Sequence, residues 1–145
     1  MKTTLPLIFL VLCYCLVVLP AQAFAATLSL TPASGTFNKS CSFSVDVILN
    51  TGGVGADGTD VYLLYDISRV TATNIATGHL YSDYSGTNID NQAGKVAVSG
   101  VSSDSAYNGT GTFATISFVV KDTGPTGVTQ IKFDFDTNYK SKVSD

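Results

Sequence analysis

The sequence predicts an all-β fold, an antiparallel β-sandwich or barrel, and three observations support this. Apolar and polar residues alternate in short segments, most clearly in CSFSVDVIL and GTFATISFVVKD, as in strands with one face on a core and one in water. Only Phe113 and Val119 interrupt the polar row of the second segment. Turn sequences rich in Gly, Pro, Asn and Asp separate the segments. After residue 26 no long window shows a helical period, and every acidic residue is Asp, with no Glu.

The first 25 residues predict a secretory signal peptide. Lys2 supplies a positive charge, residues 5–19 form an apolar run without charge, and Pro20 ends that run. The run is shorter than the roughly 20 residues of a spanning helix. Small residues favour cleavage near Ala23 or Ala25, and an uncleaved anchor is the alternative. We therefore expect residues 26–145 to be one secreted or cell-surface domain without a membrane span.

Seven strands are expected in that domain, each bounded by turn residues. The second strand has the cleanest alternation, with Val45 and Val47 toward the core and Asp46 toward water. A later strand repeats the pattern with Val96 and Val98. The connecting sequences PASG, TGG, ADG, NG and TGPTG favour turns. The expected strands are residues 27–30, 42–49, 60–65, 70–75, 95–101, 114–120 and 129–135.

Charge and cysteine content exclude some classes of partner and bond. Without Lys2 the chain has 7 Lys and Arg residues against 11 Asp, a net charge of −4, so nucleic acid is not an expected partner. Cys13 and Cys15 leave with the signal peptide, so no intrachain disulfide is possible. We expect the remaining Cys41 to be a small buried residue at the start of a strand.

No catalytic set is visible, so we expect a non-enzymatic protein without a cofactor. The only histidine, His79, lies in the loop sequence TGHLYSDY, whereas a triad or a zinc site needs more partners. Asp134 and Asp136 in FDFD share one strand face, with Phe133 and Phe135 on the other, which we interpret as an amphipathic strand end. A calcium site at these acids or at the turn DGTD is the alternative. Neither has the acid count of a dedicated loop, so no metal is predicted.

Three tyrosines in expected loops have two interpretations. Tyr81, Tyr84 and Tyr107 could form a small platform on which a sugar ring stacks. Alternatively, they cover the ends of the sandwich as amphipathic caps, which is the interpretation that we favour.

Several motifs in order resemble a bacterial cohesin domain. They are DVYLLYDISRVTATNIATGHLYSDY, then KVAVSGVSSDS, then GTGTFATISFVVKDTGPTG. Cohesins carry a strand ending in Tyr-Asp, here Tyr65-Asp66, and a later strand with the pattern that begins here at Gly111. The similarity covers residues 28–145, and the order of the motifs is more specific than any one of them.

The resemblance implies a nine-stranded jelly-roll sandwich that binds a dockerin-type protein module on one sheet face. Such modules assemble polysaccharide-degrading enzymes outside the cell, and calcium, if present, is expected on the partner. The same fold also occurs in carbohydrate-binding modules, so sugar binding, or a structural role in a surface adhesin, is the alternative. The partner-binding residues that the resemblance implies are Asp60, Tyr62, Leu64, Asn91, Ser99 and Ser103.

The chain also departs from the family pattern. The middle loop, here SGTNIDNQAG, is short, and Ser103 stands where cohesins often have an acid. The C-terminal stretch TQIKFDFDTNYKSKVSD finishes an expected strand and stops in polar sequence. We therefore expect that a closing strand is missing and lies beyond Asp145, because a sandwich with an unpaired last strand would expose an edge.

Overall fold

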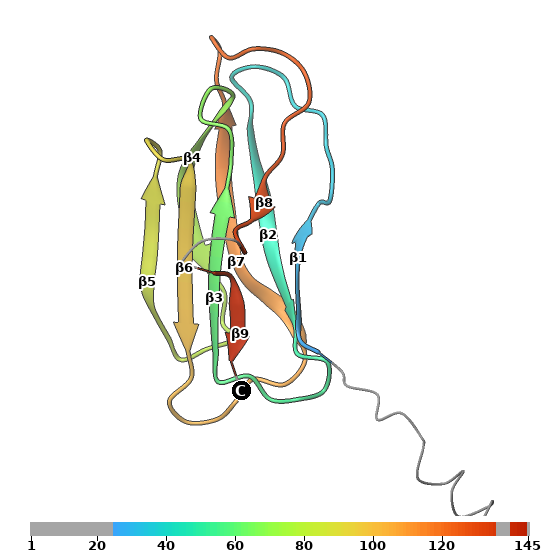
Figure 1. Ribbon diagram of the computed structural model, residues 1–145, viewed down its shortest axis with the longest axis vertical. Helices are drawn as coiled ribbons and strands as arrows, with labels where there is room; N and C mark the ends of the chain where they lie inside the picture. The colour runs from blue at the N-terminus through green and yellow to red at the C-terminus, as the bar shows by residue number, and fades with distance from the viewer. Residues whose placement is uncertain (1–24, 136–139, 145) are drawn as a thin grey trace, which may run out of the picture.

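The computed structural model describes residues 25–135 and 140–144, and these residues form two antiparallel β-sheets (Figure 1). The strands are β1 (Thr27–Thr31), β2 (Ser42–Asn50), β3 (Gly58–Leu64), β4 (Val70–Thr77), β5 (Asp83–Asp90), β6 (Lys95–Val101), β7 (Thr110–Val120), β8 (Lys132–Phe133) and β9 (Lys142–Ser144). One sheet has the order β1-β2-β7-β4, and the other has the order β5-β6-β3-β8, with β9 also paired to β3. Most strands that pair within a sheet are distant in sequence. This arrangement confirms the predicted all-β sandwich with jelly-roll connectivity.

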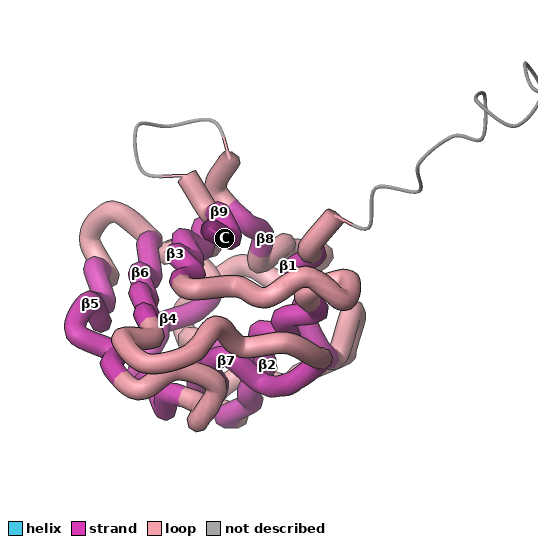
Figure 2. Tube along the Cα trace, turned by 90° about the horizontal axis from the view of Figure 1, so that it is seen from below, coloured by secondary structure: helices cyan, strands magenta, loops and turns pink. Residues whose placement is uncertain are grey.

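The two sheets enclose one hydrophobic core. Viewed end-on, they form two layers, with β5, β6 and β3 in one and β2 and β7 in the other (Figure 2). Inward and outward residues alternate along β3 and β6, as a pleated strand requires. The largest fully buried side chains include Phe113, Phe118, Leu49, Leu63 and Ile116. No helix in the described residues is long and apolar enough to cross a membrane.

A β-bulge explains why Phe113 interrupts the alternation of its strand. Val47 on β2 pairs with Ala114 on β7, but the next residue, Ile48, pairs with Thr112. Phe113 is therefore the extra residue of β7, and a bulge re-aims the side chain of such a residue. Phe113 and Ala114 both point into the core and are fully buried. The bulge shifts the register, and this explains why Phe113 interrupts the polar row expected from the sequence.

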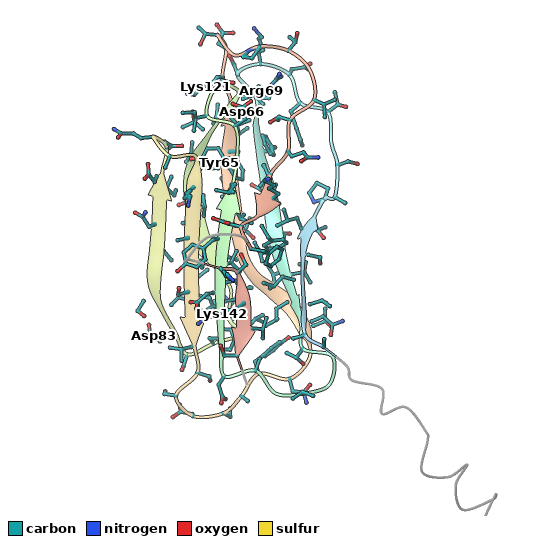
Figure 3. The ribbon with its side chains drawn as sticks, in the orientation of Figure 1. Tyr65, Asp66, Arg69, Asp83, Lys121 and Lys142 are labelled. Atoms are coloured by element: carbon teal, nitrogen blue, oxygen red, sulfur yellow. The ribbon has the colours of Figure 1, made fainter. Side chains whose placement is uncertain are left out.

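The Tyr65-Asp66 motif ends β3 and builds the turn to β4. The Asp66 carboxylate accepts hydrogen bonds from the backbone N–H of Ser68 at 2.8 Å and from its hydroxyl at 2.6 Å. These bonds, more than the Arg69 guanidinium 3.1 Å away, hold the pKa of Asp66 below its ordinary value of 3.8. Arg69 also donates to the carbonyl groups of Pro125 and Gly127. It therefore fastens the loop after β7 to this turn, at the upper end of the sandwich in Figure 3.

The predicted strand 129–135 is much shorter in the structure, and a further strand follows it. β8 pairs with Leu63 and Leu64 of β3, and β9 pairs with residues 58–60 of the same strand. Between them, the Ser141 hydroxyl accepts from the Tyr62 N–H at 2.9 Å and donates to the Tyr62 carbonyl at 3.0 Å. β8 and β9 thus act as one interrupted edge strand along β3.

Other predictions differ from the structure at strand ends and in one loop. β5 lies where the sequence analysis placed a loop, because SDYSGTNID has no clear alternation and a bulge separates Asp83 from Gly86. Cys41 precedes β2 and is exposed, so the prediction of a buried cysteine is wrong. Asp134 is 2% exposed whereas Phe135 is 54% exposed, the reverse of the predicted amphipathic strand end. Asp136 lies outside the described residues.

A groove of about 450 Å³ separates β1 from β9. Apolar side chains from both sides line it, among them Leu28, Val54, Phe135 and Val143. Ala25 also lines this groove, so the first described residues lie close to the last ones. On this side the outer edge of β1 has no strand beside it among the described residues, because β1 pairs only with β2.

Candidate binding face

The outer face of the sheet β5-β6-β3-β8 carries most of the residues predicted to bind a partner. On β3, Asp60, Tyr62 and Leu64 alternate with the buried Thr59, Val61 and Leu63, and so point outward. Ser99 lies directly opposite Asp60 on β6. The four predicted residues Asp60, Tyr62, Leu64 and Ser99 therefore share one surface.

Three cross-strand rows define this surface, which we call the β3–β6 face. The first row joins Asp60, Ser99 and Gly86, the second joins Tyr62, Ala97 and Asn88, and the third joins Leu64, Lys95 and Asp90. Small residues occupy β6 in two of the rows, so Tyr62 is the largest side chain of the two central strands. A sheet face of this kind suits a broad protein contact more than the concave pocket of a small ligand.

Two ion pairs cross this face. The Lys142 ammonium on β9 lies 3.3 Å from the Asp60 carboxylate. The Lys95 ammonium on β6 lies 3.4 Å from the carboxylate of Asp134, which follows β8. Asp134 is buried and makes further contacts, so its charge is compensated as burial requires.

Two predicted residues lie at the ends of the sheet, away from the centre of the face. The Asn91 amide spans the two sheets: it accepts from the Ala72 N–H at 3.0 Å and donates to the Ala72 carbonyl at 2.9 Å. It also accepts from the Tyr65 hydroxyl at 2.6 Å. Ser103 lies beyond β6 at the other end, where its N–H donates to the Ser82 hydroxyl. The structure therefore brings together four of the six predicted residues.

The lysines of this face were not among the predicted binding residues. The alternation of β6 predicts that Lys95 points outward, as Ser99 does. Lys95 could therefore have been placed on this face from the sequence. Lys132 shares the row of Leu64 because the two residues pair. Lys142 was not accessible to pattern reasoning, because β9 has three residues and no visible period.

The three tyrosines of the sugar-stacking alternative form a cluster at one end of the core. Tyr81 is 6% exposed, and its ring meets those of Tyr107 and Phe113 edge-on, at 68° and 77°. Tyr84 packs against Tyr81 at 58°. Rings inclined in this way do not present one flat platform, so the cluster resembles the amphipathic caps of the favoured interpretation.

Burial changes the acidity of this cluster. Desolvation raises the pKa values of Tyr81 and Tyr84 above the ordinary value of 10.0. The Tyr81 hydroxyl hydrogen-bonds to Thr59 at 2.7 Å. The Tyr84 hydroxyl is buried near the backbone N–H groups of Leu80 and Tyr81, without a well-aligned hydrogen bond among the described residues.

The candidate catalytic and metal-binding groups do not come together in the part of the chain that the structure describes. His79 is exposed in the loop after β4, on the side of the tyrosine cluster. Within the described residues, no group of three His, Cys or acidic side chains is placed to hold a metal ion. The β3–β6 face is one of the two regular outer sheet faces of this β-sandwich.

The family follows from comparison with known proteins. A family model described as the cohesin domain matches residues 28–144, and the chain therefore belongs to the cohesin family. The predicted resemblance is confirmed. No curated protein matches the chain.

Solved structures share the fold at low sequence identity. The seventh ScaB type I cohesin from Pseudobacteroides cellulosolvens is 20% identical, with a TM-score of 0.64 over 81% of this chain and 84% of that chain. CaCohA2 from Clostridium acetobutylicum is 18% identical, with a TM-score of 0.69 over 83% of this chain and 79% of that chain. The sixth cohesin of Acetivibrio cellulolyticus scaffoldin B, solved in complex with a Cel5 dockerin mutant, is 22% identical, with a TM-score of 0.59 over 83% and 93%.

Proposed function

We propose that this chain is a non-catalytic cohesin module that binds a dockerin-type protein through the β3–β6 face. The observation that carries the proposal is the outward row of Asp60, Tyr62 and Leu64 beside the small residues of β6. An interface of standard size needs about 800 Å² on each partner, which one face of a five-stranded sheet can supply. Membership of the cohesin family and the dockerin complex of a structural neighbour support this choice of partner.

The proposal includes the setting of the module. Residues 1–25 act as a cleaved signal peptide, so the domain works outside the cell or on its surface, in an assembly linked to polysaccharide degradation.

Direct binding to purified dockerins tests the function. The Cel5 dockerin of Acetivibrio cellulolyticus and the dockerin modules of the source organism would be titrated calorimetrically, with calcium and with a chelator. Saturable binding to a dockerin that the chelator abolishes supports the proposal. Retention on insoluble polysaccharide without dockerin binding would favour the carbohydrate-binding alternative instead.

A Tyr62→Ala variant tests the face. Tyr62 is the large aromatic residue among small neighbours, and central aromatic residues often dominate binding energy. We expect affinity to fall by about 2 kcal/mol, roughly thirtyfold in Kd. Val119→Ala on the outer face of the other sheet is the matched control and should leave affinity unchanged. Equal effects of the two substitutions on binding would show that the contact does not lie on the β3–β6 face.

A further inference from the structure

Charge is distributed unevenly across the β3–β6 face. Asp83 and Asp90 lie on β5 at one edge, where they share the outward rows of Val101 and Lys95. Lys132 and Lys142 lie on β8 and β9 at the opposite edge, and Lys95 lies between the two edges. Figure 3 shows Asp83 near the lower end of β5 and Lys142 near β3, away from β5. The face therefore has an acidic edge and a lysine edge, although the chain as a whole is acidic.

In both ion pairs on the face, the cation is the more exposed partner. The Lys142 side chain is 62% exposed, against 30% for Asp60. The Lys95 side chain is 39% exposed, against 2% for Asp134. Within the part of the chain that the structure describes, Lys132 is exposed and makes no ion pair. A molecule approaching this half of the face thus meets ammonium groups first, with the carboxylates behind them.

We propose that the partner places carboxylates opposite Lys95, Lys132 and Lys142, so that this half of the face recognises an acidic protein surface. The inference rests on the proposed function and deepens it, because it names the chemistry of the partner's contact surface. Complementary charges steer association and reject partners of the wrong sign. The acidic β5 edge fixes orientation, since a uniformly acidic partner surface is repelled by Asp83 and Asp90.

In this arrangement Asp60 acts on the partner through Lys142 and not by direct contact. A carboxylate in direct contact with the partner would accept a hydrogen bond from it, and its loss would weaken binding. Here the Lys142 ammonium lies 3.3 Å from one oxygen of the Asp60 carboxylate. Asp60 is therefore a positioning residue that holds Lys142, and it partly cancels the charge that the partner senses.

The polarity of the face can be tested without any partner. Amide signals of the protein would be recorded with a neutral, an anionic and a cationic paramagnetic co-solute. We expect the anionic probe to broaden the amides of Lys132 and Lys142 more than those of Asp83 and Asp90, and the cationic probe to do the reverse. Equal broadening at both edges by both charged probes would overturn the inference, whatever the protein binds.

The chemistry of the partner is tested with a displayed library built on the Cel5 dockerin, with its exposed helix positions randomised. We expect selection on the protein to enrich Asp and Glu, and selection on a K132E/K142E variant to lose that enrichment. Enrichment of Lys and Arg on the unmodified protein would overturn the inference. Failure to select any binder would count against the proposed function, while the co-solute result still decides the polarity.

Association kinetics of a binder selected from this library test the contribution of the lysines, and whether Asp60 contacts the partner or only positions Lys142. The K132E/K142E variant should lower the association rate constant roughly ten- to a hundredfold at low salt, and less at high salt because screening shortens the reach of charges. Lys39→Glu, a single charge reversal of the same type outside the face, is the control and should have little effect. Asp60→Asn should leave association unchanged or faster. Slower association or a loss of affinity with Asp60→Asn would show that Asp60 itself contacts the partner.

Discussion

Asn91 takes the place of a neighbouring strand at the free edge of β4. Its amide pairs with both the N–H and the carbonyl group of Ala72, as a backbone peptide would. Edge strands expose such groups and invite pairing with other chains, so a side chain that satisfies them protects the edge. The same amide accepts from Tyr65 and so links the two sheets.

This role predicts a loss of stability in an Asn91→Ala variant. Removing the amide leaves the part-buried N–H and carbonyl of Ala72 without their partner and leaves the Tyr65 hydroxyl only the Asp90 carbonyl at 3.4 Å, which costs about 1–3 kcal/mol. Urea unfolding followed by circular dichroism measures this cost. Asn88→Ala on the exposed face of β5 is the control, with an expected change within about 0.5 kcal/mol. A similar loss in both variants would contradict the edge-capping role.

The positions of some residues could be predicted from the sequence, and those of others could not. Asp60, Tyr62, Leu64 and Ser99 could be placed on one face because strand alternation alone decides parity. Asn91 could not be assigned, because its partner Ala72 is 19 residues away and belongs to the other sheet. Burial of Asp134 was equally hidden, since it depends on Lys95 39 residues earlier.

At the scale of elements, β2 and β7 form the most extensive strand pair of the sandwich. Nine residues of β2, from Ser42 to Asn50, have partners on β7. One side of this pair is core and the other is solvent, so neighbouring residues of β2 differ sharply in burial. Val47 is fully buried beside the bulge, whereas Ile48, the next residue, points outward and is half-buried.

This contrast predicts different costs for two matched truncations. Val47→Ala should lower the free energy of unfolding by about 1–3 kcal/mol, because it leaves a cavity in the core. Ile48→Ala removes a larger side chain but should cost less, about 1 kcal/mol or below, because water can fill the space. Thermal and urea unfolding of both variants would measure the difference. A cost for Ile48→Ala as large as that for Val47→Ala would refute the assigned register.

Strands with long, regular alternation were predictable, and short or irregular strands were not. β2, β3, β6 and most of β7 follow from their patterns because each has one face on the core. β5 was not predicted because a bulge interrupts it and its buried and exposed positions do not alternate regularly. β8 and β9 have two and three residues, too few to show a period, and their pairing with β3 depends on tertiary contacts.

At the scale of the whole molecule, two buried tyrosines and the half-buried Tyr84 link stability to alkaline pH. Desolvation raises the pKa values of Tyr65, Tyr81 and Tyr84 above the ordinary value of 10.0. In the unfolded chain these hydroxyls ionise near the ordinary value, so above it the unfolded state binds fewer protons than the folded state. Stability is therefore fully present below pH 10 and falls as pH rises toward the raised values.

We expect the midpoint of urea unfolding to decrease steadily as the pH rises from 10 toward the raised pKa values. Tyrosinate absorbance should appear at a higher pH in the folded protein than in the protein unfolded in urea. A Tyr84→Phe variant should reduce the slope with little cost at neutral pH, because the Tyr84 hydroxyl has no well-aligned partner among the described residues. Tyrosinate signals that coincide in folded and unfolded protein would contradict this prediction.

The groove that Ala25 and Val143 share also determines how the sandwich responds to tension. Because these residues lie at the same end, a pull applied through them acts across the strands and not along them (Figure 1). Hydrogen bonds loaded in this direction open one after another. Traction on the polypeptide would therefore peel β1 from β2 and β9 from β3 first. The central β2–β7 and β3–β6 pairs would bear the load only after these outer strands had detached.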